Sequence, residues 1–196
     1  MGLIDDLNDY WDILGEDDNN FCFSNDDGSY TYGTTPFETF NKIIQSLERP
    51  KRFIVLGSSI GWQCFYWNQL FPDIPTIGYD IHDVRVNFTK EMVKKHRLNN
   101  IEFYNKSMLD VDIKDGDLIW ENNLCIDNSI SDSVNWRALT CNIDIKIVSY
   151  SPILSHYRVD DNSLLLMDES GFKGFQFRRE TLPTSWCERQ TFFIID

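Results

Sequence analysis

The chain has 196 residues, the size of one domain with a single buried core. Its hydrophobic content of 42% and aromatic content of 14% indicate a packed globular protein rather than a disordered one. The net charge of −13 excludes a general attraction to nucleic-acid phosphates and favours a basic protein or peptide as partner. The acids could equally serve only to keep the protein soluble.

The acidic residues gather at the N-terminus. Residues 1–41 contain ten acids and no Lys or Arg, whereas the other 155 residues hold 21 acids and 18 bases. We therefore divide the chain into an acidic N-terminal helix and loop, residues 1–31, and a single domain, residues 32–196. Apolar residues such as Leu3 and Leu7 predict a helix over residues 3–14 that packs on the domain or, alternatively, meets a partner.

The five cysteines are scattered, without CxxC or Cys/His clustering, which predicts free thiols and no metal site. The sequence has no apolar run of 18 residues and no signal segment. We expect a soluble intracellular protein, cytoplasmic or nuclear, without membrane contact. The oligomeric state is not indicated.

Predicted helices and strands alternate along the chain. Four helices are expected: from Pro36 to Leu47, over the aromatic segment that ends at Pro72, from Asp83 to about residue 98, and over residues 129–139. The third of these helices has an apolar face of Val84, Phe88, Met92 and Val93. Strands are expected at residues 53–56, 76–79, 101–104, 117–121, 143–150, 164–167 and 191–195, the last two as an antiparallel pair. This order predicts an α/β fold, a doubly wound Rossmann-like sheet that is mostly parallel with an antiparallel C-terminal strand.

The stretch from Arg52 to Asp80 has the pattern of a nucleotide-binding unit: strand, glycine turn, helix, strand and acid. Gly57 and Gly61 let the backbone approach a ligand, and Asp80 can accept hydrogen bonds from ribose hydroxyls. The turn lacks the middle glycine of GxGxxG, which disfavours a pyrophosphate and favours S-adenosylmethionine. The alternatives are a turn that only packs helix on strand, and an Asp80 that only caps the next helix, although Asp83 is better placed for that.

Asn122 and Asn123 follow the predicted strand 117–121, at the edge where ligands bind in doubly wound sheets. An amide there could orient a substrate amine or the methionyl part of the cofactor. The alternative is a turn pair without a binding role.

The order of elements resembles class I, seven-strand S-adenosylmethionine-dependent methyltransferases. Several runs are similar to the histone-lysine methyltransferases that lack a SET domain, the disruptor-of-telomeric-silencing family. The similar runs are Tyr32–Phe37, Leu56–Gly61, Asp80, Asn122–Cys125, Lys146–Ser149, Ser185–Trp186 and Phe192–Phe193.

The resemblance implies a protein-lysine methyltransferase and assigns roles to single residues. Tyr32 and Thr35 would close over the cofactor, and Asp80 would hold its ribose. Gly57, Ser58 and Gly61 would line the methionine side, Ser107 and Met108 would lie along the adenine, Asn122 would face the methyl-transfer centre, and Trp186 and Phe193 would wall a channel for the target side chain.

The chain departs from the family pattern at three acids, which are replaced by Thr34, Val55 and Ser107. It also has no basic tail of the kind that such enzymes use against nucleosomal DNA, so a basic protein or free histone is the expected substrate. Two alternatives remain open. One is a methyltransferase for a small molecule or a nucleic acid, and the other is a catalytically weak protein of this fold that acts as a binding or regulatory module.

Overall fold

Helices and strands alternate along most of the chain in the computed structural model, which describes residues 2–9, 35–123, 126–140, 144–151, 159–160, 163–168, 171–184 and 188–195. A helix over residues 3–9 comes first. The later elements are α2 (Phe37–Ile44), β1 (Arg52–Leu56), α3 (Trp62–Leu70), β2 (Thr76–Asp80), α4 (Asp83–Lys95), β3 (Ile101–Asn105), η2 (Met108–Asp110), β4 (Asp117–Glu121), α5 (Asn128–Thr140), β5 (Lys146–Ser149), β6 (Val159–Asp160), β7 (Ser163–Asp168), β8 (Gly171–Gln176), β9 (Arg178–Leu182) and β10 (Gln190–Ile195).

Seven strands form the main sheet in the order β3-β2-β1-β4-β5-β10-β9. Strands β1 to β5 pair in parallel, and β10 runs antiparallel to both β5 and β9. The predicted fold, a doubly wound and mostly parallel sheet with an antiparallel C-terminal strand, is confirmed. The strand order reverses between β1 and β4, and such a reversal opens the ligand crevice of doubly wound sheets.

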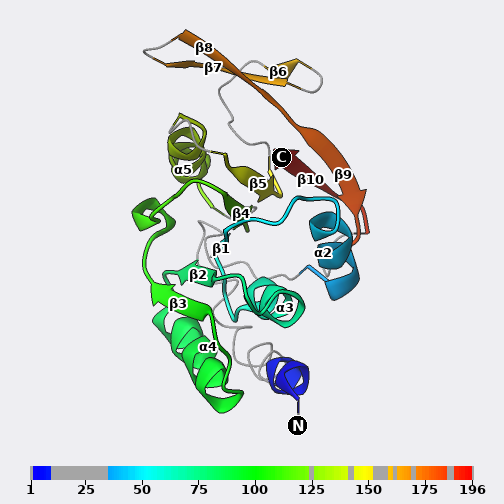
Figure 1. The fold of residues 1–196 in the computed structure, drawn as a ribbon, viewed down its shortest axis with the longest axis vertical. Helices are drawn as coiled ribbons and strands as arrows, with labels where there is room; N and C mark the ends of the chain where they lie inside the picture. The colour runs from blue at the N-terminus through cyan, green and yellow to red at the C-terminus, as the bar shows by residue number, and fades with distance from the viewer. Residues whose placement is uncertain are drawn as a thin grey trace.

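The two faces of the sheet bury different helices (Figure 1). Because side chains alternate along a strand, Phe53 and Val55 of β1 join a core cluster with residues of α2, α3 and α4. Ile54 and Leu56 face the other way, into a second cluster with α5. We call these the α3-side cluster and the α5-side cluster.

The C-terminal third differs from the prediction. The apolar run 164–167 lies in β7, which pairs with β6 and β8 in a separate three-stranded sheet, and not with β10. This small sheet projects at the top of Figure 1, beyond α5 and β5. The partner of β10 is β9, whose RRETL sequence carries no apolar alternation. An edge strand needs a partner on one side only and tolerates such charged residues, which explains why the pattern missed it.

Two predicted helices need correction. Helix α2 ends at Ile44, a turn earlier than expected, and Pro36 is its N-cap rather than its first helical residue. In α4, His82 is the N-cap and Asp83 is already helical, so the predicted Asp83 cap is wrong. Of the predicted apolar face of α4, Met92 is buried and Phe88 and Val93 pack against the α3-side cluster, but Val84 is 60% exposed.

The helix over residues 3–9 packs on the domain, as one of the two expectations had it. Leu3 and Leu7 are buried in the α3-side cluster. The buried Asp6 carboxylate contacts Lys95 Nζ at 2.7 Å and His96 Nε2 at 2.5 Å, at the end of α4. These hydrogen bonds, from Lys95 first and His96 second, lower the pKa of Asp6. The rest of the predicted helix, residues 10–14, lies outside the described residues.

Candidate functional site

The crevice between the carboxyl ends of β1 and β4 brings the glycine turn against the Asn122 segment. The backbone N–H of Asn122 donates to Leu56 O at 3.0 Å, and its side-chain Nδ2 donates to Gly57 O at 2.8 Å. A Cβ at Gly57 would stand 3.3 Å from Asn122 O, and the φ of Gly57 is +69°. Glycine is therefore needed at position 57 for both conformation and space.

The glycine turn leads directly into α3. Gly61 is the N-cap of α3 with φ +87°, and a Cβ there would lie 2.8 Å from ring atoms of Phe65 and Phe103. This glycine thus permits the helix to pack closely on β3. Ser59 stands where dinucleotide-binding turns have their middle glycine, and it keeps a left-handed φ of +48°. A non-glycine residue in that conformation costs about 1–2 kcal/mol, so the turn geometry is retained at a cost.

Asp80 ties the end of β2 to the glycine turn. Its Oδ2 accepts from Ser59 N at 2.7 Å and its Oδ1 accepts from His82 N at 2.8 Å. The residue is 8% exposed. Each carboxylate oxygen can accept a further hydrogen bond, which is the requirement for holding two ribose hydroxyls. Asp80 reaches the N-cap residue of α4 but does not cap that helix.

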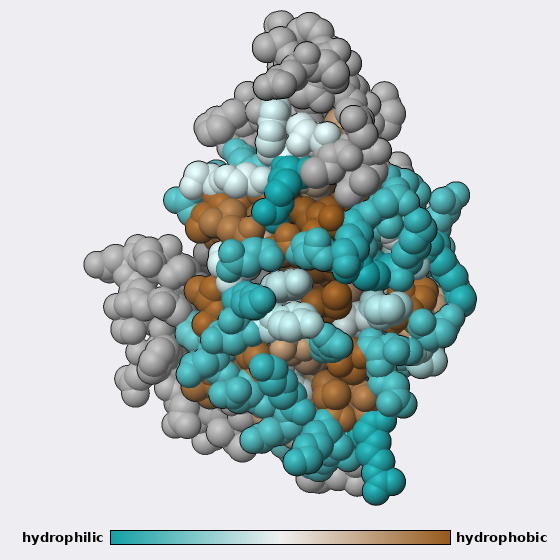
Figure 2. Space-filling model, turned by 60° about the vertical axis from the view of Figure 1, so that its left-hand side comes forward, coloured by the Kyte–Doolittle hydropathy of each residue, from teal (hydrophilic) through white to brown (hydrophobic). Residues whose placement is uncertain are grey.

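Exposed apolar side chains lie next to Asp80 in the chain and next to the end of β3. Ile81 is 61% exposed and Leu109 is 42% exposed, and both belong to the few large apolar side chains that are exposed among the described residues. Lys106 N donates to Asp80 O at 3.0 Å, so the segment that leads to Leu109 is held at the end of β2. Figure 2 brings this side of the molecule forward and shows apolar surface between hydrophilic residues.

The predicted adenine-side residues take different positions. Ser107 caps η2, its Oγ accepting from Leu109 N at 3.2 Å. Met108 is 9% exposed and belongs to the α5-side cluster. The exposed apolar side chain of this segment is that of Leu109, one residue beyond the predicted pair.

Asn122 belongs to a buried polar group with residues from three other elements. Asn122 Oδ1 accepts from Gln63 Nε2 at 3.3 Å and from Trp120 Nε1 at 3.2 Å. The same two donors face Tyr150 OH at 3.5 and 3.4 Å. We call this closed arrangement of Asn122, Gln63, Trp120 and Tyr150 the hydrogen-bond ring. The hydroxyl of Thr35, a predicted cofactor residue, is hydrogen-bonded to Tyr150 OH.

A second buried network lies on the α5 side of the same edge. Asn123 Oδ1 accepts from Ser149 Oγ at 3.1 Å and from the backbone N–H groups of Tyr150 and Ser151, at 3.2 and 3.1 Å. Its Nδ2 donates to Glu121 Oε2 at 3.3 Å. The pair predicted at positions 122 and 123 thus joins β4 to the glycine turn through one amide and to the end of β5 through the other.

Glu121 is fully buried at the end of β4. Ser131 Oγ and Asn135 Nδ2 of α5 donate to its carboxylate at 2.7 and 2.9 Å. Burial raises the pKa of Glu121 to about 7, because the hydrogen bonds from Ser131 and Asn135 offset only part of the desolvation and the nearby Asp132 adds repulsion. Among the described residues no cation forms an ion pair with Glu121.

The predicted channel residues are not brought together with Asn122 in the described part of the chain. Tyr32 and Trp186 lie outside the described residues. Phe193 belongs to the α5-side cluster, with its ring centroid 6.3 Å from that of Phe177. Its neighbour Phe192 is fully buried on the other face, 5.0 Å from the Tyr150 ring. Of these two neighbouring phenylalanines, Phe192 rather than Phe193 therefore lies beside the hydrogen-bond ring.

Four residues of the site were missed by the sequence reasoning, and two of them left a signal. Gln63 is the first polar residue in the otherwise apolar start of α3, and Glu121 is an acid that ends a buried strand. Trp120 and Tyr150 left no signal in the sequence, because an aromatic residue in an apolar run does not reveal its hydrogen bonds.

Among the described residues, no group of three or more His, Cys, Asp or Glu could hold a metal ion. No helix of the described ranges combines the length and apolar character of a membrane span.

Comparisons with known proteins bear on the fold. No protein-family model matches the sequence, and no curated protein sequence matches it. The structure is similar to that of the tRNA (uracil-54, C5)-methyltransferase of Pyrococcus abyssi, solved in complex with S-adenosyl-L-homocysteine, with a TM-score of 0.51 and 14% identity over 81% of this chain and 36% of that one. It is also similar to the PH0226 protein of Pyrococcus horikoshii, with a TM-score of 0.51 and 10% identity over 82% of this chain and 88% of that one.

These likenesses show the fold alone. The chain has a Rossmann-like sheet similar to that of the tRNA methyltransferase, and it spans about a third of the length of that protein.

Proposed function

We propose that this protein is an S-adenosylmethionine-dependent methyltransferase that transfers a methyl group to a lysine of a basic protein. The observation that carries the proposal is the place of the glycine turn at the reversal of strand order, where Ser59 N of the turn donates to the Asp80 carboxylate at 2.7 Å. A nucleoside ligand needs this combination of close backbone, paired acceptor oxygens and apolar surface.

The residues of the crevice suit S-adenosylmethionine better than a dinucleotide. Ser59 carries a side chain where close approach to a pyrophosphate requires glycine. The Oγ atoms of Ser58 and Ser59 are buried and have no hydrogen-bond partner among the described residues. Unpaired polar atoms in a turn at a helix N-terminus are what a polar ligand would satisfy.

Different residues would hold different parts of the cofactor. Asp80 would accept from the ribose hydroxyls, and the exposed side chains of Ile81 and Leu109 would cover the adenine. Gly57 and the N-terminus of α3 at Gly61 would face the methionyl part. The roles of Tyr32, Thr35, Ser107 and Met108 stay predictions.

Methyl transfer needs alignment and a water-poor site more than a strong acid or base. When bound, S-adenosylmethionine supplies an electrophilic methyl group on a positively charged sulfur. Trp120, Tyr150 and Phe192 are buried at the C-terminal edge and would exclude water beneath the acceptor. Such apolar surroundings favour the neutral, nucleophilic amine of a lysine. The channel roles of Trp186 and Phe193 stay predictions.

A basic protein is favoured as acceptor by charge. The net charge of −13 attracts Lys- and Arg-rich segments and repels nucleic acid. The interactions of Asn122 favour a second candidate, a catalytically weak binding module. Its Oδ1 already accepts from Gln63 and Trp120, so it could orient a substrate amine only by giving up one of these bonds.

Calorimetric titration of Asp80→Asn with S-adenosylmethionine tests the cofactor assignment. The amide keeps the shape of the side chain but loses one acceptor oxygen, so we expect the affinity to fall at least thirtyfold. Asp83→Asn is the matched control, because Asp83 is exposed and contacts only the backbone N–H of Val84 in the described structure. No detectable binding by the unmodified chain at millimolar ligand would exclude the enzyme proposals.

The acceptor is tested by transfer of a tritiated methyl group to free histones, to RNA and to a cell lysate. The proposal predicts label on lysine in histones or other basic proteins. Label on RNA or small molecules alone would show that the acceptor is not a basic protein. Cofactor binding without any methyl transfer would support the binding-module alternative.

A further inference from the structure

Tyr150 takes part in the candidate site without facing the crevice itself. It follows β5, is 4% exposed, and no pattern in the sequence singled it out. Its hydroxyl nevertheless contacts polar side chains from three elements that the chain brings together only on folding. A buried tyrosine whose hydroxyl has this many polar neighbours holds those neighbours in place in addition to packing.

The protons of the hydrogen-bond ring can be assigned from the chemistry of its members. Gln63 Nε2 and Trp120 Nε1 are donors only, and both face the phenol oxygen of Tyr150. The phenol oxygen therefore accepts from these two groups, and the Tyr150 and Thr35 hydroxyls share a further hydrogen bond. Tyr150 thus connects the segment before α2 with α3 and β4.

The ring also fixes the orientation of the Asn122 amide. Because Gln63 Nε2 and Trp120 Nε1 can only donate, the group of Asn122 that faces these two nitrogens is its oxygen, at 3.3 and 3.2 Å. The nitrogen then points to Gly57 O, to which it donates at 2.8 Å. A flipped amide would place a donor against two donors and an oxygen against the Gly57 carbonyl.

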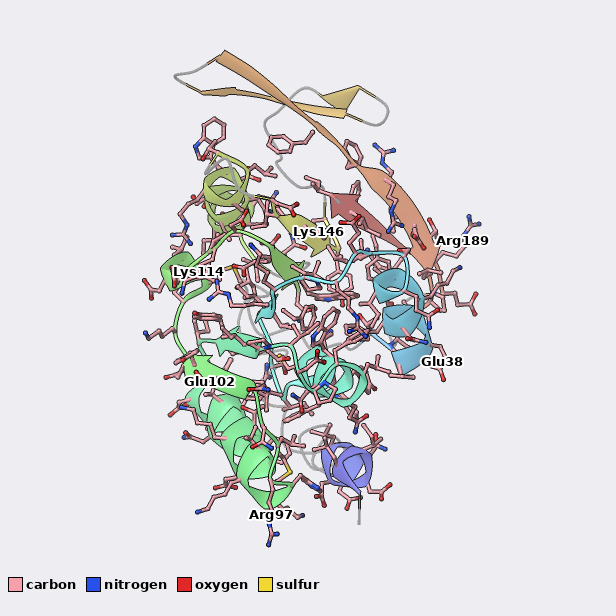
Figure 3. The ribbon with its side chains drawn as sticks, viewed as in Figure 1. Glu38, Arg97, Glu102, Lys114, Lys146 and Arg189 are labelled. Atoms are coloured by element: carbon pink, nitrogen blue, oxygen red, sulfur yellow. The ribbon has the colours of Figure 1, made fainter. Side chains whose placement is uncertain are left out.

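Gly57 is the first residue of the turn that faces the proposed cofactor. We propose that Tyr150 is a positioning residue of the cofactor site, because the hydrogen-bond ring that it completes holds the Asn122 amide, and through it the Gly57 carbonyl, in place. This inference rests on the proposed function and adds a residue that does not touch the cofactor. Figure 3 shows how densely side chains fill the space between α2, α3 and the strands, while the labelled Glu38 and Arg97 lie at the outside of the molecule.

Tyr150→Phe tests this role, because it removes the hydroxyl and leaves the ring packed against Trp120 and Phe192. The ligand-free readout is the NMR exchange rate of the Asn122 side-chain amide protons, which we expect to rise at least tenfold. The second readout is calorimetric affinity for S-adenosylhomocysteine, which we expect to fall about tenfold. Tyr66→Phe is the control, since Tyr66 lies in the same aromatic cluster, 5.8 Å from Phe40, and outside the hydrogen-bond ring.

The outcomes separate the two proposals. Faster exchange at Asn122 together with weaker binding, both absent in Tyr66→Phe, supports the positioning role. The positioning role is overturned if the exchange rate of the Asn122 amide protons is unchanged in Tyr150→Phe. It is also overturned if that rate rises but the affinity for S-adenosylhomocysteine is unchanged. If the unmodified chain binds no S-adenosylhomocysteine, the proposed function fails, and the positioning role fails with it. Should Tyr150→Phe not fold, Gln63→Leu removes the donor on the opposite side of the hydrogen-bond ring and must give the same two changes.

Discussion

At the scale of single residues, the site depends on buried polar groups that hold one another. Asn122 and Asn123 are adjacent in the chain, yet one side chain binds the glycine turn and the other binds the end of β5. Buried polar groups without partners are costly, so each amide is fixed by its neighbours rather than free to turn. Val55, at the position where the resemblance in the sequence led to the expectation of an acid, is fully buried in the α3-side cluster, where valine packs without a desolvation penalty.

Glu121 should make the stability of the protein depend on pH. Its pKa rises from 4.5 in the unfolded chain to about 7 in the folded one, so the folded state binds the proton more tightly. The resulting stability is fully present below pH 4.5 and is lost as pH rises through 7. The size is about 3 kcal/mol of unfolding free energy.

Glu121→Gln tests this dependence, because the amide is neutral at every pH. We expect the variant to gain unfolding free energy relative to the unmodified chain between pH 5 and pH 8, by roughly 2–3 kcal/mol. Urea unfolding at a series of pH values measures it, with the exposed Glu91→Gln as control. A difference between variant and unmodified chain that stays constant over this range would contradict the assignment.

At the scale of elements, the N-terminal helix behaves as part of the domain core. Leu7 is fully buried among residues of the α3-side cluster, and Asp6 is held by the two residues at the end of α4. Hydrogen bonds from Lys95 and His96 lower the pKa of Asp6, so their stabilising effect is present above pH 3.8 and is lost as pH falls through the lowered value. The first residues of the acidic segment thus stabilise the domain itself, whether or not the segment also binds a partner.

Leu7→Ala should lower the unfolding free energy by about 2–4 kcal/mol, because it removes a fully buried side chain and leaves a cavity. Asn8→Ala, on the exposed side of the same helix, should change it by less than about 0.5 kcal/mol. Urea unfolding of both variants gives the comparison. A Leu7→Ala effect as small as that of the control would mean that the helix is not docked in solution.

Hydrophobic periodicity and glycine spacing predicted the helices and strands of the parallel part of the sheet, and the structure has these elements at the predicted places. Strands β2 and β4 fall where the apolar runs 76–79 and 117–121 placed them, because parallel strands buried on both faces are continuous apolar segments. The charged edge strand β9 has no such pattern and was missed. In α4 the buried face agrees with the prediction at Met92, Phe88 and Val93 but not at Val84, because tertiary contacts bury Arg85 and leave Val84 exposed.

At the scale of the whole molecule, the fold positions residues that no local pattern relates. Thr35, Gln63, Asn122 and Tyr150 meet only because β1, β4 and β5 run parallel and end at the same edge. The sequence indicated Thr35 by resemblance, Asn122 by its place after a predicted strand as well as by resemblance, and Gly57 and Asp80 by their place in the nucleotide-binding pattern. Sequence reasoning missed Gln63, whose polarity in an apolar helix start was a weak signal, and Tyr150, because the hydrogen bond between their side chains spans 87 residues of chain.

Hydrogen–deuterium exchange with and without S-adenosylhomocysteine tests the central claim most directly, that the carboxyl-end crevice between β1 and β4 binds the cofactor. The account predicts slower exchange on ligand addition in residues 57–62, 80–84, 107–110 and 122–123, with the small sheet β6-β7-β8 unaffected. Protection confined to other segments, or no protection anywhere at millimolar ligand, would contradict it.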